Sequence, residues 1–448
     1  MPRQPRTPNT ALAGLMQAGG IGNAQLARRV NAAGRELGIT LHYDKSSVSH
    51  WLAGAVPRPP ARPAVLEALS RLLGRPVTCA EIGWPDSGPA DAHDPVAGVI
   101  DLSRADMDPS RRSVLQVGMY AATLAVPSYE HLTETADRVE HAAAGRTLHI
   151  GRSDVETVRT MTDKVADILD QVGAGHARPM AAAFLVNTIG TYLGASGTER
   201  VKREMRSAAA DFVYLTGWMA MYENAQGLGQ RYYLRALDLA GAAEDHVTYC
   251  RTLRGMSLQA SHLGHGQRAL ELADSAAEAA PSSGPRLVAF LRGQQAAAAA
   301  MTGDRHTALA RLTETETALA QADNRRDAVG GYDQAAYYFH EAHVRWHLKD
   351  REGSVRALRR SNAARSPLER QGRLHCLGVI AERQFRMRHV EAACDTWGQF
   401  LDEYVTISSA RGDEHLKTLR KSLPAYKSLP VVRALSERAR EVARLKAA

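Results

Sequence analysis

Three histidines, His340, His343 and His347, stand close together in a segment that reads HEAHVRWH. Their spacing places them on one face of an α-helix, where imidazole nitrogens could bind a single metal ion. The spacing supplies no fourth ligand, and a polar helix face beside a groove gives the same pattern. We favour this second interpretation, and we expect neither a metal nor a cofactor.

Other sequence patterns that carry catalysis are absent. The chain contains no GxxxxGK[ST] phosphate loop, no GxSxG nucleophile elbow and no HExxH zinc motif. Its scattered aspartates and glutamates form no recognisable acid–base pair. We therefore expect a binding protein rather than an enzyme.

The stretch DKSSVSHWLAG, residues 44–54, is the strongest candidate for binding. Asp44 is a good N-cap, because its carboxylate can accept hydrogen bonds from the N–H groups of a first helical turn. One face of the expected helix is apolar and can pack on a small core. The apolar residues are Val48, Trp51 and Leu52. The side chains on the open face are Lys45, Ser46, Ser49 and His50.

A second helix is expected just upstream, over residues 22–30 (GNAQLARRV). The two helices together resemble the Cro/repressor-type (XRE) helix-turn-helix family. The matching residues are Leu26, Ala27, Val30, Ser47, Val48, Ser49 and Trp51. The resemblance implies that the 44–54 helix enters the major groove of a double-stranded DNA operator. The residues expected at the DNA are Asn23, Gln25, Arg28, Lys45, Ser46, Ser47, Ser49, His50 and Arg58.

Residues 31–43 separate these helices by more than the turn of about four residues that the family uses. Either the first helix is longer or a wing-like loop is inserted, and both alternatives stay open. Downstream, residues 64–74 resemble the closing helix of such domains, which often end near a position like Trp84.

The positive charge is concentrated near the N-terminus. The net charge is +8, and residues 1–84 hold ten Lys or Arg against four Asp or Glu, which leaves +2 for the rest. A small basic domain on a nearly neutral body is typical of nucleic-acid binding, although a solvated basic surface has the same composition.

Composition also bounds the class of protein. Hydrophobic residues make up 44% of the chain, without a run of about 18 apolar residues, which favours a soluble protein that does not enter a membrane. Four cysteines form no CxxC pair, so we expect neither a disulfide framework nor a zinc finger. We expect a cytoplasmic protein.

From residue 153 onward, nearly every segment has apolar residues at helical spacing. Helix–turn–helix units recur between residues 214 and 411. The expected turns are Gly227–Gly229, Gly264–Gly266, Gly303–Asp304, Lys349–Asp350 and Arg388–His389. The second-helix positions expected to be equivalent are Tyr232, Ala269, Ala308, Ser354 and Ala392.

These units resemble tetratricopeptide repeats, although their spacing exceeds the repeat of about 34 residues and an irregular helical bundle is the alternative. A more diverged unit is expected over residues 177–206, and the segment from His415 to the end is expected to cap the solenoid. The predicted fold is all-α, with a helix-turn-helix domain at 1–84, a Pro- and Gly-rich linker at 85–109 and a helical-repeat domain at 110–448.

The first helices of such a solenoid line a concave groove, where polar and aromatic side chains could bind a peptide or a small signal molecule. Each candidate could equally be a solvated surface residue. The candidates are Asn187, Tyr192, Tyr222, Asn224, Arg254, Gln259, Gln294, Gln295, Tyr338 and His340.

The head and solenoid together resemble the helix-turn-helix/tetratricopeptide quorum-sensing regulators of Gram-positive bacteria, in particular the actinomycete members. The resemblance implies a homodimer on a palindromic operator, regulated by a signal bound in the solenoid. The competing function is that of an adaptor, whose repeats bind a partner protein and whose head no longer binds DNA.

Overall fold

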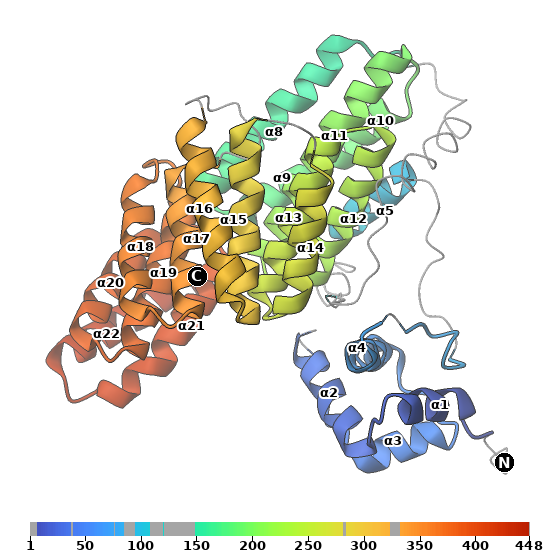
Figure 1. The fold of residues 1–448 in the computed structure, drawn as a ribbon, viewed down its shortest axis with the longest axis horizontal. Coiled ribbons are helices and arrows are strands. Elements are labelled where there is room, and N and C mark those ends of the chain that lie inside the picture. The colour runs from blue at the N-terminus through green and yellow to red at the C-terminus, as the bar shows by residue number, and fades with distance from the viewer. Residues whose placement is uncertain are drawn as a thin grey trace.

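The computed structural model describes residues 7–36, 39–75, 77–84, 95–107, 120, 148–280, 284–322 and 332–447. Over these residues the fold is all-α, as predicted, and the sole extended pairing is an isolated bridge between His149 and Ser196. The chain forms an N-terminal head and a larger helical body (Figure 1). None of the described helices is both long enough and apolar enough to cross a lipid bilayer.

The head forms the three helices that the sequence predicts, α2, α3 and α4, together with the helix α1, which was not predicted. Its elements are α1 (Thr10–Ala18), α2 (Asn23–Glu36), α3 (Lys45–Leu52), the 3-10 turn η1 (Pro59–Ala61) and α4 (Arg62–Leu73). Asp44 caps α3, because its carboxylate accepts hydrogen bonds from the backbone N–H groups of Ser46 and Ser47. Val48 and Trp51 are buried in the head core. The first part of the 31–43 insertion continues α2 to Glu36, so the longer-helix alternative is correct.

The body starts with five elements that pack together and continues as packed pairs of helices. The first elements are α5 (Pro95–Met107), α8 (Arg152–Val172), α9 (Ala174–Phe184), the π-helical η2 (Leu185–Ile189) and α10 (Gly190–Leu193). The pairs that follow are α11 (Glu199–Tyr222) with α12 (Gln226–Ala242), α13 (His246–His262) with α14 (Gly266–Glu278), α15 (Pro285–Thr302) with α16 (Arg305–Gln321), α17 (Gln334–His347) with α18 (Arg351–Ala364), and α19 (Arg370–Arg386) with α20 (Val390–Tyr404). The C-terminal elements are α21 (Ala410–Ser422), η4 (Leu423–Tyr426) and α22 (Pro430–Ala447).

One backbone device recurs at the turn inside each pair. The turn residues with left-handed φ are Asn224, Gly264, Gly303, Lys349 and Arg388. Five residues after each of them, a small buried residue lies in the second helix. These small residues are Gly229, Ala269, Ala308, Ser354 and Ala393. The repeat is therefore real, and its longest spacing is explained by residues 322–333, which separate α16 from α17.

Three sequence predictions about boundaries in the repeat are wrong. The first turn lies at Asn224, because Gly227–Gly229 belong to α12, where a Cβ on Gly229 would lie 3.0 Å from the Gly217 carbonyl oxygen. The equivalent positions in the first and last pairs are Gly229 and Ala393 rather than Tyr232 and Ala392. Residues 177–206 do not form a separate unit, because α9, η2 and α10 follow α8 as its partner and α11 begins the next pair.

The predicted linker also contains a helix. Within residues 85–109, α5 packs against α9 and α12, and it buries Val99, Ser103 and Asp106 at helical spacing. The Asp106 carboxylate pairs with Arg178 of α9 and accepts a hydrogen bond from the Tyr232 hydroxyl at 3.1 Å. The sequence analysis assigned these residues to a linker because of their proline and glycine content, and it did not consider the helical spacing of Val99, Ser103 and Asp106. The other linker residues, 85–94 and 108–109, lie outside the described residues.

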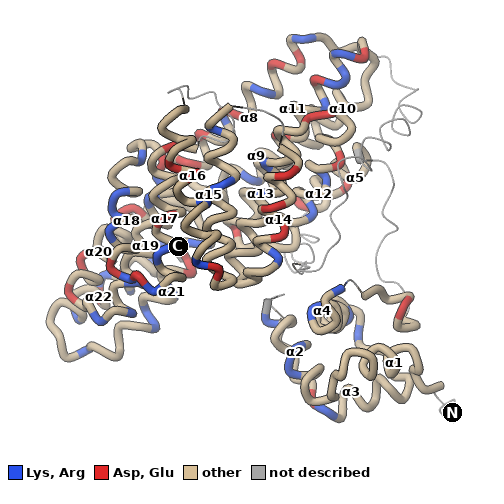
Figure 2. Tube along the Cα trace, viewed as in Figure 1, with Lys and Arg blue, Asp and Glu red and all other residues tan. Residues whose placement is uncertain are grey.

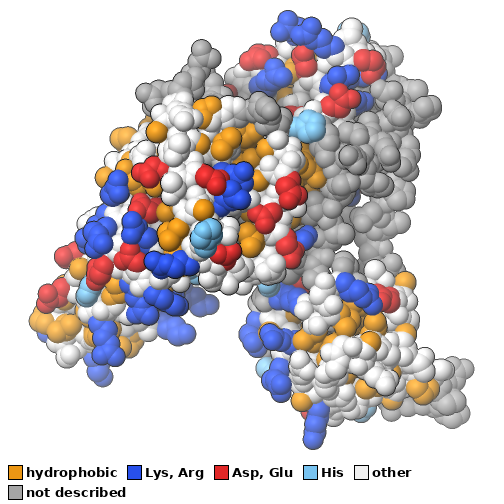
Figure 3. Space-filling view, in the orientation of Figure 1, with side chains coloured by type: hydrophobic (Ala, Val, Ile, Leu, Met, Phe, Trp, Pro, Cys, Tyr) orange, Lys and Arg blue, Asp and Glu red, His pale blue; other side chains and the backbone are white. Residues whose placement is uncertain are grey.

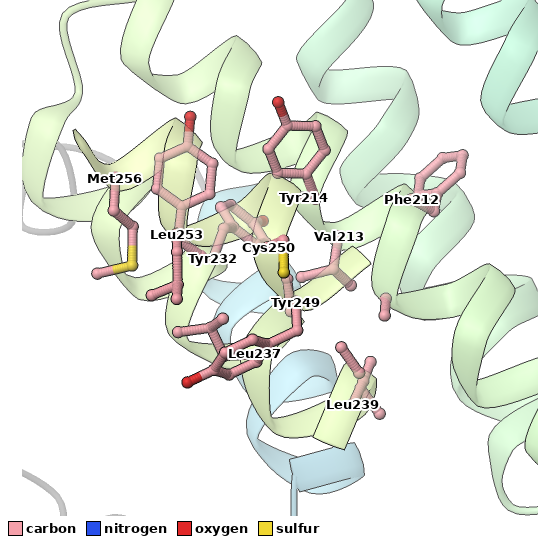
Figure 4. Packing of buried hydrophobic residues seen from close by; sticks show 14 of the residues in the cluster. Phe212, Val213, Tyr214, Tyr232, Leu237, Leu239, Tyr249, Cys250, Leu253 and Met256 are labelled. Atoms are coloured by element: carbon pink, nitrogen blue, oxygen red, sulfur yellow. The ribbon is translucent and has the colours of Figure 1, made fainter. Parts of the chain in front are cut away.

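The largest core extends through the body from α5 and α8 to α17, and Figure 4 shows the part of it around α11, α12 and α13. Phe212 and Val213 of α11 lie in this core together with Tyr232 of α12 and Leu253 of α13, all of them fully or almost fully buried. Burying such large side chains supplies most of the free energy that holds helix pairs together.

The body curves until α19 lies against the early helix α8. The first helices α11, α13, α15 and α17 contact one another in succession, which places them on the inner side of the curve. Farther along the chain, α19 packs against α8. The Ser408 N–H donates to the Val172 carbonyl oxygen at 2.9 Å, and the Gly175 N–H donates to the Ser408 carbonyl oxygen at 3.2 Å. We call this contact between residues 172–175 and residue 408 the seam.

Gly173 is required at the seam for two reasons. Its φ of +94° and ψ of 165° fall in a region that only glycine adopts readily. A Cβ there would also lie 2.1 Å from the Ser408 carbonyl oxygen. Gly303 has a similar φ of +88°, but a Cβ on it would meet nothing within 4 Å.

We therefore expect Gly173→Ala to lower the free energy of unfolding by at least about 2–3 kcal/mol, and Gly303→Ala to lower it by about 1 kcal/mol. Urea unfolding of the full chain measures both. Equal losses in the two variants would mean that the close approach of Ser408 does not constrain Gly173.

Asp170 of α8, which lies shortly before the seam in the chain, makes stability depend on pH. Burial raises the pKa of Asp170 from 3.8 to about 7, Glu369 adds to the rise and Arg365 opposes it. Because the folded state binds the proton more tightly than the unfolded state, Asp170 stabilises the protein fully below about pH 4, and this stability is lost as the pH rises towards 7.

We expect Asp170→Asn to stabilise the protein by roughly 2–4 kcal/mol at pH 8, with the gain vanishing towards pH 4. Glu156→Gln on the same helix is the matched control, because that carboxylate is 71% exposed and lies 3.9 Å from the Arg159 guanidinium. Thermal unfolding across pH 4–8 distinguishes them, and identical pH profiles would refute the assignment.

Candidate functional site

One surface of the head gathers the residues predicted to contact DNA. We call the solvent-facing side of α2 and α3 the basic face. Lys and Arg positions occur along both helices (Figure 2), and Lys and Arg side chains gather on this part of the head surface (Figure 3). Its exposed residues are Arg28, Arg29, Lys45, Ser46, Ser49 and His50, and Arg58 is exposed on the loop after α3. Its half-buried residues are Asn23, Gln25 and Ser47.

Side-chain hydrogen bonds fix α3 against α2. The Asn23 amide donates to the Ser49 hydroxyl at 3.0 Å, which joins the start of α2 to the middle of α3. The Asn31 amide donates to the Tyr43 carbonyl oxygen at 2.7 Å and accepts from the Tyr43 N–H at 2.9 Å. The Tyr43 ring then packs edge-on against Trp51, with ring centroids 4.9 Å apart. These contacts set the angle at which the chain enters α3.

The three serines of α3 are engaged within the head. The hydroxyls of Ser46 and Ser47 donate to the Asp44 carboxylate at 2.8 and 2.9 Å, and the Ser49 hydroxyl donates to the Lys45 carbonyl oxygen at 3.0 Å. Hydrogen bonds from Ser47 and Ser46 lower the pKa of Asp44 to about 2. Asp44 is therefore anionic at neutral pH and occupies the N-terminus of α3. The cations of Lys45 and the nearby arginines remain directed outward.

The predicted ligand-binding residues lie in different parts of the body. Asn187 and Tyr192 lie on η2 and α10, outside the series of first helices. Four others are engaged in contacts within the fold: Gln259 with Gln226, Gln294 with Ser257 and Ser261, Gln295 with Asp274 and Arg292, and Asn224 with Glu414. Tyr338 is half-buried, and Arg360 covers its ring at 3.9 Å from the ring centroid.

The remaining candidates, Tyr222, Arg254 and His340, lie on the inner side of the curved body. Arg254 is 7% exposed; its guanidinium carbon lies 4.3 Å from the Phe290 ring centroid, and its Nη2 lies 3.3 Å from Nε2 of His340. The Arg411 guanidinium carbon lies 4.6 Å from the Tyr222 ring centroid. Arg411 was not predicted, because only the curvature of the body brings α21 to α11.

Histidines on four inner helices extend this region. The His262 ring lies 5.8 Å from that of His375, and Nδ1 of His375 lies 3.0 Å from Nε2 of His415. Burial lowers the pKa of His340, His343 and His375 well below 6.5, so these rings are neutral at neutral pH. His262 is nevertheless exposed, so solvent reaches the inner side of the body there.

The three histidines of α17 do not converge. Nδ1 of His340 lies 2.9 Å from the Tyr332 hydroxyl, whereas the His343 ring packs on Phe339, with centroids 4.6 Å apart. Within the described part of the chain, no group of three or more His, Cys, Asp or Glu is arranged to hold a metal ion.

Comparison with known proteins adds one match, confined to the head. The SP15 N-terminal domain family matches residues 12–85, which include nearly all of α1 and the whole of α2–α4. A search of curated proteins finds no match.

The hydrogen bonds of Asn31 generate a prediction about α3. We expect Asn31→Ala to destabilise the head by about 1–3 kcal/mol, because the part-buried N–H and carbonyl oxygen of Tyr43 would each lose a hydrogen-bond partner. Hydrogen exchange of the α3 amides in the full chain measures the loss. Asn23→Ala, which removes one exposed hydrogen bond, is the matched control and should accelerate exchange much less. Equal exchange in both variants would contradict this role for Asn31.

Proposed function

We propose that the protein is a DNA-binding transcriptional regulator whose helical body binds a signal ligand. The observation that carries the proposal is the basic face. It presents Arg28, Arg29, Lys45 and His50 on two adjoining helices, and none of the three cations forms an ion pair with a described residue. Exposed cations on a rigid pair of helices suit the regularly spaced phosphates of a duplex.

The capping of α3 specifies how DNA would bind. The Asp44 carboxylate already accepts the N–H groups at the start of α3, so a phosphate would not take that position. Lys45, the first residue of α3, and His50, in its last turn, would instead contact base edges or phosphates, while Arg28, Arg29 and Arg58 hold the flanking backbone. Ser46 and Ser47 would act through the cap rather than through the bases.

A contact between head and body supports coupling between DNA and ligand. The Arg71 guanidinium of α4 donates to the Tyr120 carbonyl oxygen at 3.4 Å. The Tyr120 ring stacks on His265, with centroids 5.5 Å apart, and His265 follows the helix that carries Arg254 and His262. A ligand that favours one arrangement of this helix would shift the head between two positions, and binding of DNA and ligand would be linked. We expect a homodimer to place two such heads on a palindromic operator.

We expect the double substitution Lys45→Ala with His50→Ala to weaken selective DNA binding by about 2–4 kcal/mol and to reduce the salt dependence by about one phosphate contact. Purified protein would be tested on genomic fragments, including its own promoter, across a salt series. Lys421→Ala removes an equivalent exposed charge from the body and is the matched control. Unchanged affinity in the double variant would refute the proposed contact helix, and uniformly unselective binding by the natural protein would favour an adaptor.

A further inference from the structure

The ligand of the body can be inferred from two buried arginines, an inference that rests on the proposed sensing function. Arg254 of α13 and Arg411 of α21 are each 7% exposed. A Cβ on Gly255, which follows Arg254, would lie 3.4 Å from the ring carbon that carries the Tyr233 hydroxyl, so this hydroxyl lies beside α13. Both guanidinium groups also oppose the rise in the pKa of Tyr233 that burial causes. Tyr222 lies beneath Arg411 and also interacts with Arg254. We call Tyr222, Tyr233, Arg254 and Arg411 the arginine centre.

The polar atoms of this centre are incompletely paired. Nε of Arg254, Nη2 of Arg411 and the Tyr233 hydroxyl are buried without a hydrogen-bond partner in the described protein. Arg254 has one polar contact, to the neutral His340, and Arg411 has no hydrogen bond to a described residue. Three unsatisfied donors from three helices thus lie in one buried region.

Other buried arginines of the body show what is missing. Arg178 pairs with Asp106, and Arg383, which has no carboxylate partner in the described protein, donates hydrogen bonds to the Ala342 carbonyl oxygen and the Ser354 hydroxyl. No described carboxylate lies within ion-pair distance of Arg254 or Arg411. Glu414 acts on Arg411 from farther away, and one of its oxygens accepts a hydrogen bond from Asn224 at 2.5 Å. Burying a cation without a counter-ion is unfavourable, so the centre lacks one anion.

The surroundings restrict the rest of the ligand. The rings of Phe290 and Tyr222 lie against the two guanidinium groups, and Trp218 lies 5.5 Å from Tyr222, measured between ring centroids. Trp218 and Tyr222 are half-buried and His262 is exposed, so the aromatic wall is reachable from the inner side of the body. Two planar guanidinium forks and a phenol match a carboxylate, and the rings match an apolar group attached to it.

We propose that the arginine centre binds the carboxylate of a ligand whose adjoining group is aromatic or apolar. Such a carboxylate could belong to a small aromatic acid or to the C-terminus of a peptide. Arg254 and Arg411 would hold its oxygens, the Tyr233 hydroxyl would donate a further hydrogen bond, and Trp218 and Tyr222 would pack on its apolar part.

The test measures binding to the full-length protein by calorimetry at pH 7, without DNA. The probes are phenylacetate, which represents a small acid, and N-acetyl-phenylalanyl-phenylalanine, which represents a peptide terminus. Each is compared with its neutral amide, and inorganic phosphate is a separate probe. We expect at least one carboxylate to bind with a dissociation constant below about 10 mM, and at least about tenfold more tightly than its amide. The carboxylate that binds more tightly identifies the source.

Substitutions then locate the site. Arg254→Met and Arg411→Met should each weaken carboxylate binding about 10- to 100-fold. Arg356→Met, which removes an exposed arginine from α18, should leave it unchanged. Without a probe, Arg254→Met should not lower the unfolding temperature, because methionine removes an uncompensated buried charge while retaining an apolar side chain.

Three outcomes would overturn the proposal: no binding by either carboxylate, equal binding of acid and amide, or unchanged binding in both arginine variants. Tight binding of phosphate alone would also overturn it. A lowered unfolding temperature of Arg254→Met with unchanged probe affinity would assign Arg254 to the fold. Because DNA is absent, failure of carboxylate binding is distinguishable from failure of the DNA-binding proposal.

Discussion

The seam joins an early part of the body, α8 and α9, to the segment that precedes α21. The exchange of hydrogen bonds between residues 172–175 and Ser408 holds α8 beside α19, and it needs the backbone of Gly173 in a conformation that other residues resist. Because α21 follows the seam directly, this contact holds α21 close to α11. The seam is thus what brings Arg411 over Tyr222 and places Glu414 beside Asn224.

Charge is distributed differently on the two parts of the protein. The head carries exposed cations that water and salt can screen, so they remain available to a polyanion at little cost. The body buries arginines, some of them paired as Arg178 is with Asp106, and two of them unpaired in the arginine centre. A surface charge and a buried charge select different partners, because only the buried one demands a single, well-placed counter-ion.

Local sequence patterns predicted the helices well. The apolar spacing of Val48 and Trp51 and the cap at Asp44 are local features, and the structure contains them as expected. Lys349 and Arg388 were also placed in turns from the local sequence, and both have the left-handed φ of a turn residue. The helix α5 was missed because its prolines and glycines were weighted above the burial of Val99 and Asp106, which depends on distant partners.

The candidate sites were predicted less completely, because their residues meet through curvature. Tyr222, Arg254 and His340 were chosen as polar or aromatic residues of first helices, a criterion that also selected Gln259 and Gln294, whose amides join neighbouring helices instead. No sequence signal marks Arg411, since the closing of the body over nearly two hundred residues of chain cannot be deduced from spacing. In the head, Asn31 was treated as part of an insertion, although its amide clamps the chain before α3.

The contact between α8 and α19 also affects how the body unfolds. In an open stack of helix pairs, each terminal unit has one neighbour, and unfolding begins there by fraying. Here α8 and α19 are neighbours of each other as well as of the units beside them. Detaching either of them costs two interfaces rather than one, so local opening is suppressed and unfolding becomes a more collective event. We therefore expect the body to unfold more cooperatively than an open stack of helix pairs does.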